Sequence, residues 1–130
     1  MTTFQHIQKS VDINQGFLNN YKDSEKSLNL FKEIIKKEYS IMFFLSTSAG
    51  KNFPTFDHYI ENNTYNKISN YANIIDYDNC VICLLDNTAR IKETENPDIR
   101  RELRSINNML ACLATYCKDC PAGIEAKDFL

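Results

Sequence analysis

Residues 96–120 read NPDIRRELRSINNMLACLATYCKDC and are the longest segment of this chain with a regular apolar pattern. Apolar side chains recur there at spacings of four, three, four, three and four residues, which places them on one stripe of an α-helix. The stripe consists of Ile99, Leu103, Ile106, Leu110, Leu113 and Cys117. An isolated helix of this length is only marginally stable in water, so the segment predicts partner helices that cover the stripe.

Both ends of this helix carry sequence signals. Asn96 can act as the N-cap, Pro97 suits the first helical position, and Asp98 sits where the helix dipole favours an anion. At the other end, Pro121 cannot continue a helix without losing a backbone hydrogen bond. We therefore expect the helix to begin beside Asn96 and to continue to about Cys120.

The composition is that of a small globular protein. The chain has 130 residues, of which 43% are hydrophobic and 25% charged, enough for a single domain spanning residues 1–130. Its low content of glycine (three) and proline (three) favours few, long elements. No apolar run approaches the ~18 residues that span a bilayer, and the N-terminus has no apolar stretch of the signal-peptide type. We expect a cytoplasmic protein without membrane contact, whose five cysteines stay reduced.

The first half of the chain shows two further helical patterns. A helix is expected near residues 3–20, and a second from residue 24 to about residue 45. The second would carry Met42 and Leu45 on its buried face. Residues 39–45 can alternatively be read as a strand.

The middle of the chain adds two more segments. A short helix is expected to open at Pro54. Residues 80–85, CVICLL, fit either a buried strand or a buried helix, and we choose the helix because no second strand candidate pairs with them. These patterns predict an all-α fold, a compact bundle of four to six helices in which the last two long helices are antiparallel.

Two Cys-x-x-Cys pairs are the main candidate for a metal site. Two such pairs are the usual pattern of a four-thiolate zinc site. Here 33 residues separate the pairs, more than in common zinc ribbons, and the first pair lies in an apolar run, where free cysteine acts as a small hydrophobic residue. We favour core cysteines without a cofactor and keep a zinc or iron–sulfur site as the alternative. The four residues are Cys80, Cys83, Cys117 and Cys120.

The register of a simple helical hairpin also separates the two pairs. If the helices meet near residues 92 and 97, Cys80 lies roughly 18 Å from the tip and Cys112 roughly 22 Å, at ~1.5 Å per residue. Cys117 would lie roughly 30 Å from the tip on the same measure. This register predicts that Cys80 and Cys112 are neighbours, and that the four thiols cannot share one ion.

No catalytic constellation is evident. His58 lies close to Asp57 and Glu61, but the chain lacks the repeated Glu-x-x-His pattern of helical metal sites and any local signature of a nucleophile. Residues 48–52, SAGKN, lack the first glycine and the final hydroxyl residue of a phosphate-binding loop. We therefore predict that the protein is not an enzyme.

The segment from residue 56 to residue 78 combines carboxylates with tyrosines. Residues 52–89 contain five acids and one base, whereas the net charge of the chain, −2, suggests no general attraction to nucleic acid. Tyrosine anchors surrounded by carboxylates suit recognition of a basic protein surface, although some of these tyrosines can belong to the core. The predicted partner-binding residues are Asp57, Tyr59, Glu61, Tyr65, Asp76, Tyr77 and Asp78.

These observations favour a non-enzymatic protein-binding module. A small acidic helical domain without catalytic residues fits an inhibitor, such as an immunity protein or an antitoxin that neutralises a basic toxin. The cysteine-ligated metal protein is the alternative from a different class. The sequence is also compatible with a homo-oligomer, because a second subunit can cover the apolar stripe of residues 96–120.

Overall fold

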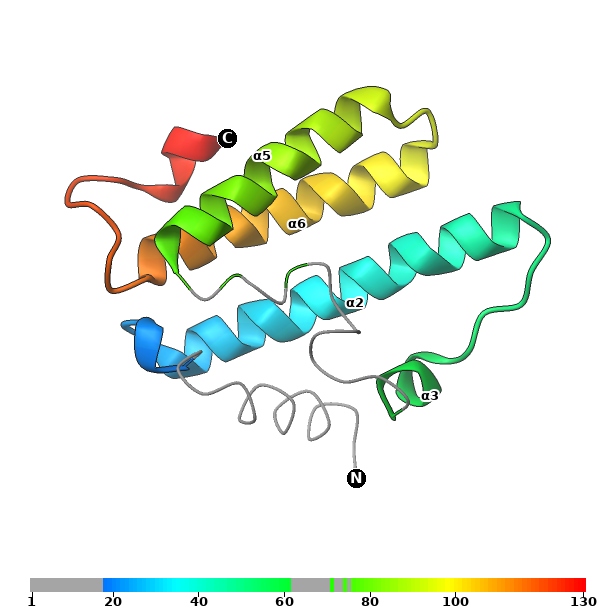
Figure 1. The fold of residues 1–130 in the computed structure, drawn as a ribbon, viewed down its shortest axis with the longest axis horizontal. Helices are drawn as coiled ribbons and strands as arrows, with labels where there is room; N and C mark the ends of the chain where they lie inside the picture. The colour runs from blue at the N-terminus through cyan, green and yellow to red at the C-terminus, as the bar shows by residue number, and fades with distance from the viewer. Residues whose placement is uncertain (1–17, 62–70, 72–73, 75) are drawn as a thin grey trace.

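The computed structural model describes residues 18–61, 71, 74 and 76–130. Figure 1 shows three long helices packed along one another and a short helix beyond them. In chain order the elements are η1 (Leu18–Asn20), α2 (Ser24–Ser48), α3 (Phe56–Glu61), α5 (Tyr77–Glu93), α6 (Pro97–Tyr116) and η2 (Ala126–Phe129).

Helix α6 is the centre of the fold, because both α2 and α5 pack along it. Its predicted stripe is buried, with Leu103, Ile106 and Leu110 fully removed from water. Helix α2 supplies Phe31 and Ile34, which are also fully buried. Each such side chain stabilises the fold by about 1.5–3 kcal/mol. The apolar stripe read from residues 96–120 is therefore the inner face of the core.

The all-α prediction is confirmed for the described part of the chain, which contains no β-strand. Residues 39–45 belong to α2 and residues 80–85 to α5, so both ambiguous segments are helical. A bundle of four to six helices is not supported, since the described residues form three long helices with the six-residue α3 beside them. The helix expected at residues 3–20 falls outside the described residues up to residue 17.

Helices α5 and α6 run antiparallel, as predicted, and are joined by the short link of residues 94–96 (Figure 1). The Asn107 amide Nδ2 on α6 donates a hydrogen bond of 3.3 Å to Thr88 Oγ1 on α5. This bond fixes the level at which the two helices face each other. Across the described ranges, no helix combines the length and the apolar content needed to cross a membrane.

The helix starts follow the sequence closely. Asn96 Oδ1 accepts hydrogen bonds from the backbone N–H groups of Asp98 (2.9 Å) and Ile99 (3.4 Å), and Pro97 occupies the first turn. Asp23 caps α2 and Asp76 caps α5 in the same way, each through its side-chain oxygen. Such caps satisfy backbone donors that the first turn of a helix leaves free.

The end of α6 differs from the prediction. The helix stops at Tyr116 instead of continuing to about Cys120, because Cys117 adopts an extended conformation (φ −64°, ψ 139°). The backbone there pairs with the segment before α2: Lys22 N–H donates to the Tyr116 carbonyl, and Lys118 N–H donates to the Asn20 carbonyl, both at 2.8 Å. This tertiary pairing competes with the last helical turn, and the stop signal at Pro121 is not reached.

The buried face predicted for the end of α2 is also wrong. Met42 is 36% exposed and Leu45 is 49% exposed. The reason is the register against α6, where Lys37 Nζ lies 3.3 Å from Glu102 Oε2, only five residues from the first residue of α6. The helices run in opposite directions (Figure 1), so α2 passes the start of α6 near Met42 and its last turns extend beyond α6.

Replacing Leu110 by alanine should lower the free energy of unfolding by about 2–5 kcal/mol, because it opens a cavity in the core between α6 and its neighbours. The exposed neighbour Asn108 provides the control, and Asn108→Ala should change the value by less than about 0.5 kcal/mol. Urea denaturation followed by circular dichroism measures both. Equal effects of the two substitutions would contradict the central place of α6.

Candidate functional site

The cysteine pairs are arranged differently from the predicted hairpin. Cys80 at the start of α5 lies beside Cys117 at the end of α6, and the two thiols interact. Cys112, the predicted neighbour of Cys80, lies five residues away along α6, roughly 7 Å at ~1.5 Å per residue. The prediction was wrong because it assumed that both helices start level at the hairpin tip, whereas the extended link carries α6 past the end of α5.

Tyr21 completes a buried cluster with these two cysteines. Its hydroxyl donates a hydrogen bond to the Ile74 carbonyl and lies 3.9 Å from Cys80 Sγ. Cys117 Sγ in turn donates to the Leu113 carbonyl at 3.5 Å. Tyr21 is 2% exposed and both cysteines are fully buried. The cluster therefore joins the segment before α2, the start of α5 and the end of α6.

The surroundings of the two thiols shift their acidity in opposite directions. The interaction between the two thiols, together with burial, raises the pKa of the Cys80 thiol. The same interaction lowers the pKa of the Cys117 thiol, although burial opposes this effect. Burial, and then the two neighbouring sulfurs, raise the pKa of Tyr21. Because water does not reach the cluster, the lowered pKa of Cys117 does not make it a reactive surface thiol.

The remaining members of the predicted four-thiolate site are placed separately. Cys83 lies half-buried on α5 and Cys120 lies half-buried in the turn after α6. Burial raises the pKa of both thiols. Among the described residues, which include all five cysteines, no group of three or more His, Cys, Asp or Glu side chains is arranged to hold a metal ion.

Alkylation with N-ethylmaleimide, followed by intact mass measurement, should divide the cysteines into two classes. Cys83, Cys112 and Cys120 are partly exposed and should react in the native protein, whereas Cys80 and Cys117 should react only as it unfolds. A Cys112→Ala variant should lose one fast equivalent, and a Cys117→Ala variant one slow equivalent. Five equivalents with a single fast rate would contradict the buried cluster.

The predicted partner-binding residues do not form one patch in the described structure. Tyr59 lies on α3, beside the second half of α2. Asp76, Tyr77 and Asp78 lie at the start of α5, at the other end of the molecule (Figure 1). Tyr65 and the side chains of Asp57 and Glu61 are outside the described residues.

The residues at the start of α5 have structural roles of their own. Asp76 Oδ1 accepts the hydrogen bond of Asn79 N–H, at 2.9 Å, as the N-cap. The Tyr77 N–H donates to Asp119 Oδ1 at 3.2 Å, and its ring lies 6.2 Å from that of Phe129. Asp78 is exposed in the first turn. Asp76 thus caps the helix and Tyr77 packs against the C-terminal segment, whereas Asp78 is an exposed charged residue without either contact.

Tyr59 instead belongs to a group of aromatic rings that we call the aromatic surface. Tyr39 on α2 is its hub, with ring-centre distances of 5.2–6.4 Å to four other rings. The Tyr39 hydroxyl also donates a 2.6 Å hydrogen bond to the Pro54 carbonyl, which ties the loop after α2 to the helix. The five rings are Tyr39, Phe43, Phe53, Phe56 and Tyr59.

No ring of the aromatic surface is fully buried. Phe43 is 42% exposed, and it is flanked in the sequence by the exposed Met42 and Leu45. The other four rings are partly exposed. Burial and the Glu38 carboxylate raise the pKa of Tyr59 to about 12, so its hydroxyl is a neutral hydrogen-bonding group at physiological pH. Sequence periodicity did not predict this surface, because its rings come together from α2, the loop after α2 and α3 only in the folded chain.

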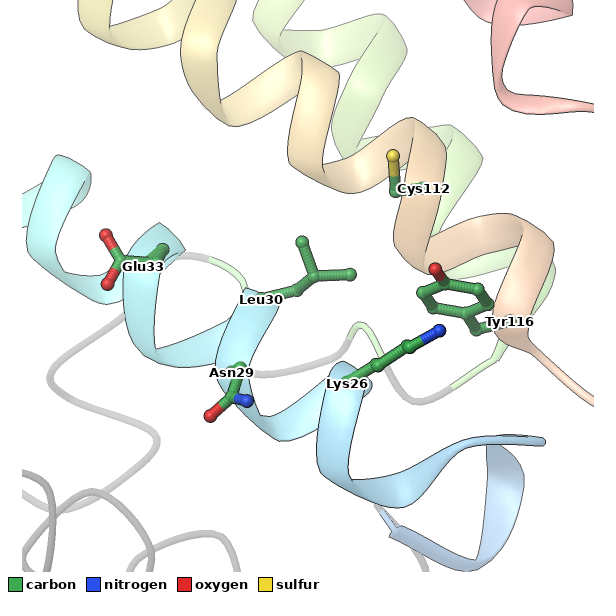
Figure 2. Close-up of a pocket in the computed structure, with 6 residues that line it drawn as sticks. All are labelled: Lys26, Asn29, Leu30, Glu33, Cys112 and Tyr116. Atoms are coloured by element: carbon green, nitrogen blue, oxygen red, sulfur yellow. The ribbon is translucent and has the colours of Figure 1, made fainter.

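A shallow groove of about 300 Å³ lies between α2 and α6. Figure 2 shows Leu30 reaching from α2 toward Cys112 and Tyr116 on α6, with the chain of Lys26 extended toward the tyrosine. Lys26 and Glu33 at its rim already form exposed ion pairs with residues of their own helix turn. The groove therefore presents an apolar floor without a convergent set of free polar groups.

A second hollow of about 310 Å³ lies beside Tyr71 and the middle of α5. The Tyr71 hydroxyl donates a 2.9 Å hydrogen bond to Asn87 Oδ1, and Arg90 Nη1 donates to the same oxygen at 3.4 Å. Cys83 and Asp86 complete the lining. Burial and the nearby Asp86 carboxylate raise the pKa of Cys83, so this thiol is not activated as a nucleophile.

Alkaline pH should destabilise the protein through Tyr71. Burial raises the pKa of Tyr71 to about 12, above the ordinary 10, so the folded state favours the neutral phenol. Its contribution is present below pH 10 and is lost as pH rises toward 12, by at most about 3 kcal/mol. Urea unfolding at pH values between about 8 and about 11 should show this loss in the wild type and a flatter profile in Tyr71→Phe. Parallel profiles for the two proteins would contradict the assignment.

Comparison of the chain with protein-family models, with curated proteins and with solved structures gave no match.

Proposed function

We propose that this protein is a non-enzymatic protein-binding module and that the aromatic surface is where its partner docks. The proposal rests on one observation, the gathering of five partly exposed aromatic rings at the edge of the core, where α3 and the loop before it meet α2. Aromatic side chains and methionine are enriched at protein interfaces and supply most hot spots, since they bury a large area at little entropic cost.

The surface is also held in place before any partner arrives. Tyr39 anchors the loop of residues 49–55 through its hydrogen bond to Pro54 and through its contact with the Phe53 ring. Phe56 and Tyr59 project from α3 onto the same hub. A docking surface that is already ordered loses less conformational entropy on binding, which favours affinity.

The charge near this surface suggests a basic partner. The sequence of α3 includes Asp57 and Glu61, two of the acids predicted to contact a partner. Carboxylates in the segment that carries an aromatic anchor suit a basic protein surface, with the charges contributing mainly to the association rate and specificity. An inhibitor of the immunity-protein or antitoxin type, acting in the cytoplasm, is the specific form of this proposal.

The test begins with the partner that co-purifies with the tagged protein from its own host. Its affinity should then be measured by isothermal titration calorimetry against surface variants. Phe43→Ser removes the most exposed ring of the aromatic surface and should weaken binding at least about tenfold. Asp57→Lys/Glu61→Lys should weaken binding of a basic partner and reduce its salt dependence.

Matched controls separate binding from folding. Glu93→Lys/Glu95→Lys makes the same change of charge at exposed positions at the end of α5 and beyond, and it should leave the affinity unchanged. Circular dichroism should show equal helix content for all variants. A partner that binds the Phe43→Ser variant as tightly as the wild type would overturn the assigned surface.

A further inference from the structure

The outward face of α5 carries a stripe of three apolar residues with a charged residue at each end, which the described part of the chain leaves exposed. Its members are spaced four, three, four and three residues apart, the rhythm of a coiled-coil seam. All are exposed, with Ile82 at 54% and Leu85 at 59% among the most exposed large apolar side chains in the described residues. The stripe consists of Asp78, Ile82, Leu85, Ala89 and Lys92.

This stripe lies opposite the side of α5 that packs on α6. The core side is marked by Cys80, Leu84 and Asn87, which are at most 4% exposed. At 3.6 residues per turn, Ile82 and Leu85 point away from those positions. Two large aliphatic side chains in water, on a helix already anchored by its other face, are explained by a partner that covers them.

The charges at the two ends of the stripe indicate which partner. Asp78 lies in the first turn of α5 and Lys92 in the last turn, and neither has an ion-pair partner among the described residues. A second α5 placed antiparallel about Leu85 brings Asp78 opposite Lys92 of the other copy, and Ile82 opposite Ala89. A parallel arrangement would oppose like charges at both ends.

We infer that this chain forms a two-fold symmetric dimer in which the α5 helices of two copies pack antiparallel along the stripe. Such an interface is isologous, because the same patch serves on both subunits. It does not involve the aromatic surface, so partner binding and self-association use separate faces. Asp86 flanks the stripe next to Leu85, so the Asp86 carboxylates of the two copies come close to each other. Their repulsion limits the affinity of the dimer.

The surface area buried between the two α5 helices sets the expected affinity of the dimer. Stable interfaces bury about 1,200–2,000 Å², more than one short helix pair provides. The dimer should therefore dissociate on dilution, and sedimentation equilibrium between about 5 and about 500 µM should follow the transition. A wild-type protein that remains a monomer throughout this range would overturn the inference.

A charge exchange tests the antiparallel arrangement. Asp78→Lys alone and Lys92→Asp alone place like charges opposite each other, so each should weaken the dimer. An equimolar mixture of the two variants should associate again, because each copy then meets complementary charges, and the double variant Asp78→Lys/Lys92→Asp should dimerise like the wild type. Recovery in neither case would show that the helices do not pair in this way.

Two further variants locate the interface. Leu85→Glu should raise the dissociation constant at least about tenfold, because it places two carboxylates at the centre of the seam. Phe43→Ser, on the aromatic surface, should leave the dimer unchanged. The opposite pattern would place self-association on the aromatic surface and refute the α5 seam, while circular dichroism shows whether each variant is folded.

Discussion

The burial of α6 from two sides is the interaction on which the rest of the structure depends. Its stripe is too wide for one neighbour to cover, so α2 packs along one flank and α5 along the other. The position of every other element follows from this arrangement. Where α2 passes the first residue of α6 it leaves the cover of that helix, and the aromatic surface lies beside this second half of α2.

The cluster of Tyr21, Cys80 and Cys117 fixes the opposite end of the molecule. It brings together three segments distant in sequence, and backbone hydrogen bonds on either side of Cys117 hold the chain before α2 against the end of α6. Thiols in this setting act as small apolar residues with weak hydrogen bonds. The Cys-x-x-Cys spacing in this chain is thus accounted for by packing, with one cysteine of each pair in the core and the other at its edge.

The apolar side chains that the core leaves uncovered are gathered on separate faces. One set surrounds Tyr39 and includes Phe43, and the other runs along α5 through Ile82 and Leu85. Scattered apolar residues on a surface need no explanation, but residues that share one helix face or one ring cluster do. We propose that the first set binds a different protein and the second a copy of the same chain, because the charges that accompany each set differ.

The sequence by itself determined the all-α class, the start of α6 at Asn96 and Pro97, and the apolar stripe from Ile99 to Cys117, since periodicity and capping are local properties. It also predicted Tyr59 as a partner-binding residue, without its ring neighbours, and that role stays a prediction. Only the tertiary structure decided the register between helices, which placed Cys80 beside Cys117, ended α6 at Tyr116 and exposed Met42 and Leu45. The physical reason is that a helix pattern shows which face is apolar, whereas the length of that face that is buried depends on where the neighbouring helix begins and ends.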